Sequence, residues 1–177
     1  MSDLFDQVTG DQDIFKKIIS KVPGFSGYIE RQNRRAADKL LRGVVADRYE
    51  EQWQRVSRLQ RDEISHGEIK YVDDLEAAAI KLRQFIDRVK TASYGYSSLF
   101  EAKKINEEEL AQLYQYDLAL LDSVDEVASA VDNVGASFGT DGLPAAIRNL
   151  TSIAQQCVDA FNRRSDVILG SEGGGSQ

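Results

Sequence analysis

The stretch from Tyr28 to Ser65 limits most strongly what this chain can fold into. It contains no proline and one internal glycine, Gly43, and its apolar residues recur every three or four positions. This spacing is typical of an α-helix, and one continuous helix over the stretch would be roughly 57 Å long. Because such a helix far exceeds the usual ~11–12 residues, other parts of the chain must bury its apolar stripe.

The same periodicity predicts four further helices. In the later segments, apolar residues alternate at intervals of three and four, which is the heptad spacing of coiled coils. Pro23 ends the first segment because proline cannot continue a helix, and Gly67 follows the long stretch, where a helix C-terminus favours glycine. The four segments are 12–22, 71–92, 106–135 and 142–169.

These segments predict one all-α domain over residues 1–169, followed by a flexible Gly/Ser-rich tail over 170–177. The expected fold class is an up-down antiparallel four-helix bundle with one extra-long helix and a short N-terminal helix. Because the long helix exceeds its neighbours, we expect one of its ends to overhang the bundle.

The composition narrows the possible functions and compartments. The chain has 177 residues and a formal net charge of −7, which argues against generic nucleic-acid binding because such binding relies on a basic surface. No run approaches the ~20 apolar residues that a membrane-spanning helix needs, and the acidic N-terminus lacks a secretory signal. The single cysteine, Cys157, fits a reducing compartment. We therefore expect a cytoplasmic protein.

Residues that could support catalysis or bind a metal are sparse. Glu63 and His66 match the Glu-x-x-His spacing of di-iron helical bundles, but those sites need a second motif and two more carboxylates, and His66 is the only histidine. Cys157 lies on the apolar seam of segment 142–169, where a buried, unreactive thiol is expected. The sequence has no recognisable Ser-His-Asp set or Gly-rich phosphate loop. We predict no enzyme activity, no metal and no cofactor.

Basic residues gather in the first half of the long stretch, whereas the segment after Ile105 is acidic. Such opposite charges either bring helices together or solvate their outer faces, and the alternative is a polar surface that binds another protein. We predict this partner surface at Arg31, Arg34, Arg35, Lys39 and Arg42.

Two tyrosines mark a second region of interest. Tyr94 and Tyr96 flank Gly95 in the stretch 93–106, which we predict to be a loop. A long loop that carries aromatic side chains is a place where a ligand or partner can bind. The alternative is a packed crossover between two helices.

Asp117 is the one polar residue on the otherwise apolar seam of segment 106–135. A carboxylate in such a position costs stability unless it has a partner. The candidate partners are an arginine of the long stretch and the hydroxyl of Tyr114 or Tyr116, and the alternative is a solvated position at the rim. Asp117 therefore joins Tyr94 and Tyr96 as a possible buried polar or loop site.

Two parts of the chain carry a resemblance to known sequences. One is the run from Lys21 through Pro23-Gly24 and Tyr28 to Lys39, and the other comprises Tyr94–Phe100 and Leu113–Leu118. They resemble an uncharacterised bacterial family of small helical proteins, over about residues 20–125. The resemblance implies a helical protein, and it implies no activity and no functional residue.

Three functional hypotheses follow from these observations. The leading one is a non-enzymatic protein–protein interaction or scaffold protein that acts through the overhanging long helix, with self-association as one form of it. The second is a peripheral membrane protein anchored by the amphipathic segment from Ile14 to Val22. The third is a ligand-binding helical bundle centred on Tyr94, Tyr96 and Asp117.

Overall fold

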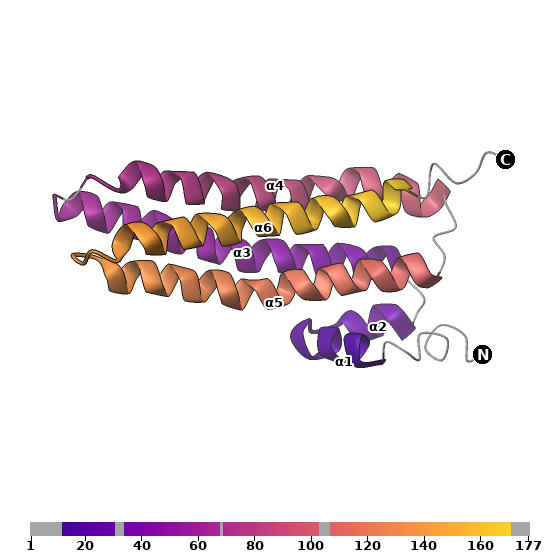
Figure 1. Ribbon diagram of the computed structural model, residues 1–177. Helices are drawn as coiled ribbons and strands as arrows, with labels where there is room; N and C mark the ends of the chain where they lie inside the picture. Colours follow the sequence, from indigo (N-terminus) through magenta and orange to yellow (C-terminus); the bar gives the residue numbers. More distant parts are fainter. Residues whose placement is uncertain (1–11, 31–33, 68, 103–106, 171–177) are drawn as a thin grey trace.

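The computed structural model describes residues 12–30, 34–67, 69–102 and 107–170 (Figure 1). Within these ranges the chain forms helices and no strands, so the predicted all-α class is confirmed. No helix in these ranges combines the length and the apolar character needed to cross a membrane. The helices are α1 (Gln12–Lys21), α2 (Phe25–Glu30), α3 (Arg34–Ser65), α4 (Val72–Ala102), α5 (Glu107–Ser137) and α6 (Leu143–Gly170).

The four long helices lie side by side and enclose one core (Figure 1). Helices α3 and α4 form an antiparallel hairpin, and α5 and α6 form another. The two hairpins pack so that α3 lies beside α5 and α4 lies beside α6, and each of these pairs runs in the same direction. Around the core the order is therefore α3, α4, α6, α5, which places α3 diagonally opposite α6.

Heptad spacing in the sequence explains which side chains fill this core. In α5 the seam residues Leu120, Val124, Val127, Val131 and Val134 are all buried. The seam of α6 is buried in the same way from Leu143 to Phe161. Fully burying a large apolar side chain contributes about 1.5–3 kcal/mol, so each of these seam residues stabilises the packing of α5 and α6 in the core.

The prediction of one extra-long helix is wrong. The stretch 28–65 divides into the end of α2 and the whole of α3, and residues 31–33 between them lie outside the described part. Helix α3 has 32 residues, α4 and α5 have 31 each, and α6 has 28. The four helices are therefore similar in length, and α3 is not an extra-long helix.

The predicted loop at 93–106 is also wrong over most of its length. Helix α4 continues through Gly95 to Ala102, and residues 103–106 lie outside the described part. A glycine inside a helix costs only about 1 kcal/mol relative to alanine, and the stretch has no proline to stop the helix. One glycine is therefore too weak a reason to end the helix at Ala92.

The short helices α1 and α2 turn back onto the side of the molecule formed by α3 and α5 (Figure 1). Gly24, with a φ of 85°, makes the reversal between them, because glycine adopts positive φ without steric cost. Arg48 Nη2 donates a hydrogen bond of 2.6 Å to the carbonyl oxygen of Lys21 at the end of α1. The Lys21 ammonium lies 2.8 Å from the carboxylate of Asp122 on α5.

Aromatic contacts complete this attachment. The ring of Tyr114 on α5 makes edge-to-face contacts with Phe15 and Phe25, at centroid distances of 5.2 and 5.7 Å. Ile18 and Val22 are fully buried beside them. The apolar face of α1 is therefore part of the core.

Two isoleucines on α4 provide a test of this core. Ile86 is fully buried, whereas 55 % of Ile80 is exposed. We expect Ile86→Ala to lower the free energy of unfolding by about 2–5 kcal/mol, because it removes packed methyl groups and leaves a cavity. Urea denaturation of dilute protein measures the change. The matched control, Ile80→Ala, should change stability by less than about 0.5–1 kcal/mol, and equal losses at both positions would contradict this placement of α4.

Candidate functional site

A cluster of four charged side chains is buried where α3, α5 and α6 meet. It consists of Asp38 and Arg42 on α3, Asp117 on α5 and Arg164 on α6. Each is at most 6 % exposed, and Arg164 has no exposed surface. Because an isolated buried charge is very costly, such a group persists only if its members satisfy one another.

Arg164 is the centre of this ionic cluster. Its Nε donates to Asp117 Oδ1 at 2.7 Å, and its Nη2 donates to Asp117 Oδ2 at 3.1 Å. This is the bidentate geometry in which a guanidinium binds a carboxylate most strongly. The same Nη2 donates to Asp38 Oδ1 at 2.7 Å. One side chain of α6 thus binds α5 and reaches the diagonally opposite α3.

Asp38 is held from a second side by Arg42, one turn further along α3. Arg42 Nε donates to Asp38 Oδ2 at 2.8 Å. All four carboxylate oxygens of Asp38 and Asp117 therefore accept hydrogen bonds from guanidinium groups. Because each of these oxygens is bound to a guanidinium and the cluster links α3, α5 and α6, the arrangement is suited to holding helices together.

Burial and ion pairing act on Asp117 in opposite directions. Removal from water raises the pKa of the Asp117 carboxyl above its ordinary value, whereas the Arg164 guanidinium lowers it. Asp38 adds a raising contribution and Arg42 a lowering one. The ionised state of Asp117 consequently depends on Arg164.

The structure changes the interpretation of the predicted basic surface. Arg42 is buried and bound to Asp38, so its assignment to a partner surface is wrong. Lys39 is exposed on α3. Arg34 and Arg35 begin α3, but their side chains lie outside the described part, as does the whole of Arg31. Among the described side chains, only Lys39 remains available to such a surface.

The second predicted group does not lie in a loop. Tyr94 and Tyr96 lie within helix α4, and their side chains are outside the described part. Asp117 is buried, so a solvated rim position is excluded. It does bind an arginine, but that arginine comes from α6 and not from the long stretch.

The sequence does contain a signal for Arg164. The apolar seam of α6 alternates steps of four and three from Leu143 to Phe161, and the next step of three reaches Arg164. The alternation thus places Arg164 on the seam, although an arginine is rarely found in a core. A charged residue on the seam of α5 and another on the seam of α6 together indicate a buried pair.

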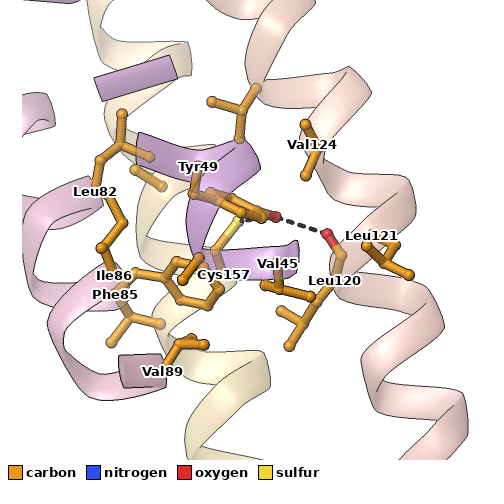
Figure 2. Close-up of a cluster of buried hydrophobic side chains, with 14 of the residues drawn as sticks. Val45, Tyr49, Leu82, Phe85, Ile86, Val89, Leu120, Leu121, Val124 and Cys157 are labelled. Carbon is orange, nitrogen blue, oxygen red and sulfur yellow. Dashed lines mark hydrogen bonds between the residues drawn. The ribbon is translucent and has the colours of Figure 1, made fainter. Parts of the chain in front are cut away.

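A second polar contact crosses the core further along the helices (Figure 2). The Tyr49 hydroxyl on α3 donates to the carbonyl oxygen of Leu120 at 2.9 Å and lies 3.4 Å from Cys157 Sγ on α6. Since the hydroxyl proton is used at Leu120, the thiol is the donor to Tyr49. Burial raises the pKa of Cys157 and that of Tyr49. The predicted burial of Cys157 is confirmed, and its thiol is poorly suited to be a nucleophile.

An exposed apolar surface lies on the α3–α4 hairpin, and we call it the hairpin surface. Ile64 near the end of α3 is 54 % exposed, Ile69 between the helices 71 % and Ile80 on α4 55 %. Ile64 also lines an open groove of about 630 Å³, together with Trp53 and Val72. The hairpin surface therefore consists of Trp53, Ile64, Ile69, Val72 and Ile80.

The described residues do not provide a candidate metal site. Within the described part of the chain, no group of three or more His, Cys, Asp or Glu side chains is placed to hold a metal ion. His66 is exposed at the end of α3, whereas Glu63 is buried, so this pair does not present its side chains together.

A groove of about 780 Å³ between α4 and α6 is lined largely by polar side chains, including Lys81 and Arg148.

No protein-family model matches the sequence, and no curated protein or solved structure matches the chain. The resemblance to a bacterial family of helical proteins therefore stays a prediction. Function has to be inferred from the chemistry of the described surface and core.

The ionic cluster gives a test with a defined pH dependence. We expect Arg164→Met to lower the free energy of unfolding near pH 7 by about 3–5 kcal/mol, because two buried carboxylates lose their shared guanidinium. In this variant burial keeps the folded-state pKa of Asp117 above its unfolded value. The deficit should therefore be largest above that folded-state pKa and shrink as the pH falls through it.

Urea denaturation at several pH values measures the deficit of Arg164→Met relative to the unaltered protein. The control is Arg163→Met, which removes the same charge from the exposed neighbouring position and should cost less than about 0.5 kcal/mol. A deficit that is small, or that grows towards low pH, would contradict the role given to Arg164.

Proposed function

We propose that this protein is a non-enzymatic protein–protein interaction or scaffold protein and that it acts through the hairpin surface. The observation that carries the proposal is the exposure of Ile64, Ile69 and Ile80 on one hairpin. Clustered exposed apolar side chains mark interaction sites in soluble proteins. This is the class of function expected from the sequence. The contact, however, lies at the closed end of the hairpin, where α3 and α4 are connected, and not at an overhang of a long helix.

The distribution of polar groups supports the same proposal. The four charged side chains of the ionic cluster bind one another, as the four oxygens of Asp38 and Asp117 illustrate. We infer that the two hairpins form an up-down four-helix bundle that serves as a rigid support. A rigid support is suited to presenting a surface, because little conformational entropy is lost there on binding.

The two other hypotheses receive less support. Membrane attachment through α1 would require Ile18 and Val22 to leave the core, where both are fully buried. A ligand site at Asp117 would have to displace Arg164, which binds both oxygens of that carboxylate. Each of these alternatives therefore requires breaking contacts, whereas binding at the hairpin surface requires none to break.

Site-specific photo-crosslinking tests the proposed function. We expect a photoreactive amino acid at position 69, introduced into the full chain in its own cells, to give discrete covalent adducts with protein. The reason is that Ile69 is the most exposed large apolar side chain of the hairpin surface. Gel analysis of the irradiated protein measures the adducts.

The matched control carries the same photoreactive group at position 148, which is exposed on α6. Position 148 should give no discrete adduct. If position 69 gives none either, or if both positions give the same adducts, the hairpin surface is not the interaction site.

A further inference from the structure

We propose that the hairpin surface binds the same surface of a second copy of this chain, which makes the protein a two-fold symmetric dimer. This inference rests on the proposed function and names the partner. Its support is that the two sides of the hairpin surface carry opposite charges, so that the surface is complementary to itself. A symmetric interface uses one patch twice and therefore needs this property.

The α3 side of the surface is basic. Arg58 and Arg61 line the groove, and both are exposed. Neither makes an ion pair or a hydrogen bond with a residue in the described part of the chain. Two cations beside an apolar surface, without intramolecular carboxylates to match them, favour a partner that supplies carboxylates.

The charged residue that α4 contributes to the groove lining is acidic. Glu76 lines the same groove, and Asp73 is exposed one turn earlier in the first turn of α4. Gln60 Nε2 donates to one oxygen of Glu76 at 2.8 Å. The other carboxylate oxygen of Glu76 has no hydrogen bond to a described residue, so it can accept one from a second molecule.

Contacts between α3 and α4 fix the level of these charges along the hairpin. The bond between Gln60 and Glu76 places these two residues side by side, and the Arg83 guanidinium lies 5.2 Å from the centre of the Trp53 ring further along. Arg58 and Arg61 are within two residues of Gln60 in the same helix. The basic pair and Glu76 therefore lie at one level, on opposite sides of the groove.

A two-fold axis parallel to the helices would bring the basic side of the groove in one copy opposite the acidic side in the other. Such a rotation places α3 of each copy opposite α4 of the other, with the two helices antiparallel and the level of each residue unchanged. Arg58 and Arg61 of one copy then face Glu76 of the second copy, and the second copy returns the same contacts. The apolar side chains near the closed end, such as Ile64 and Val72, face each other across the same interface.

The size of the groove agrees with this contact. Its lining on α3 runs from Trp53 to Ile64, a length of about 16 Å at 1.5 Å per residue. Ile80 stands on the same stripe of α4 as Glu76, four residues further on, and 55 % of it is exposed. The dimer would cover this side chain and Ile64 at the same time.

Sedimentation equilibrium of the full chain tests the dimer. We expect the unaltered protein to approach twice the mass of one chain as its concentration rises. A variant with Arg58→Glu and Arg61→Glu should dimerise about tenfold more weakly or worse, because the introduced glutamates and Glu76 of the facing copy then repel one another. Glu76→Arg should weaken dimerisation in the same way, since it places arginine opposite arginine.

Mixing the two charge-reversal variants provides the decisive comparison. In one half of a mixed dimer, the glutamates introduced at positions 58 and 61 face the arginine introduced at position 76 of the other variant. In the other half, the original Arg58 and Arg61 of the second variant face the original Glu76 of the first. Both halves pair opposite charges, so the mixture should regain a dimer that neither variant forms alone.

The control is Arg148→Glu, which reverses a charge in the α4–α6 groove and should leave the mass unchanged. Circular dichroism checks that every variant is folded. A monomeric unaltered protein, a dimer that survives both charge reversals, or a mixture that stays monomeric would each overturn the dimer. Crosslinks from position 69 to a different protein, found with a monomer in sedimentation, would overturn the dimer and leave the proposed function standing.

Discussion

The Arg164 guanidinium, buried between the carboxylates of Asp117 and Asp38, is the interaction on which the alignment of the long helices depends. Apolar seams tolerate small displacements of one helix along another, because dispersion and burial have little directionality. A buried ion pair does not, since a shift of α6 by one residue would leave charges without partners in a medium that solvates them poorly. Arg164 thus fixes the position of the second hairpin relative to the first, and it does so across the diagonal from α6 to α3.

Much of the fold could be predicted from the sequence, because helix formation and helix packing are local patterns. The seams of α5 and α6 were correct from their three- and four-residue steps, and Gly67, with a φ of 77°, ends α3 as its position indicated. The break expected at Gly95 was wrong. Gly95 sits inside a helix and Gly24 in a reversal, and Gly24 follows a proline, which cannot continue a helix.

The candidate sites were predicted less well, because pairing between distant residues leaves only a weak local signal. Asp117 was correctly singled out as a polar residue on an apolar seam, yet its partner lies 47 residues away on α6. Arg42 was counted as a surface residue because its basic neighbours suggested one, and its buried partner Asp38 lies one turn earlier. The hairpin surface was not predicted for a similar reason, since exposed isoleucines look the same in a sequence as buried ones.

The core and the hairpin surface have opposite characters. In the ionic cluster, charges are matched within the molecule, whereas on the α3–α4 hairpin apolar side chains are exposed, and there we propose contact with another molecule. A double-mutant cycle between Asp38→Leu and Arg164→Met tests the central role of Arg164 most directly. We expect a coupling in unfolding free energy of at least about 1.5 kcal/mol between these two positions, well above the ~0–1 kcal/mol typical of an exposed pair such as Lys21 with Asp122. Effects that add to within about 0.5 kcal/mol would show that the two residues do not act together and would contradict that role.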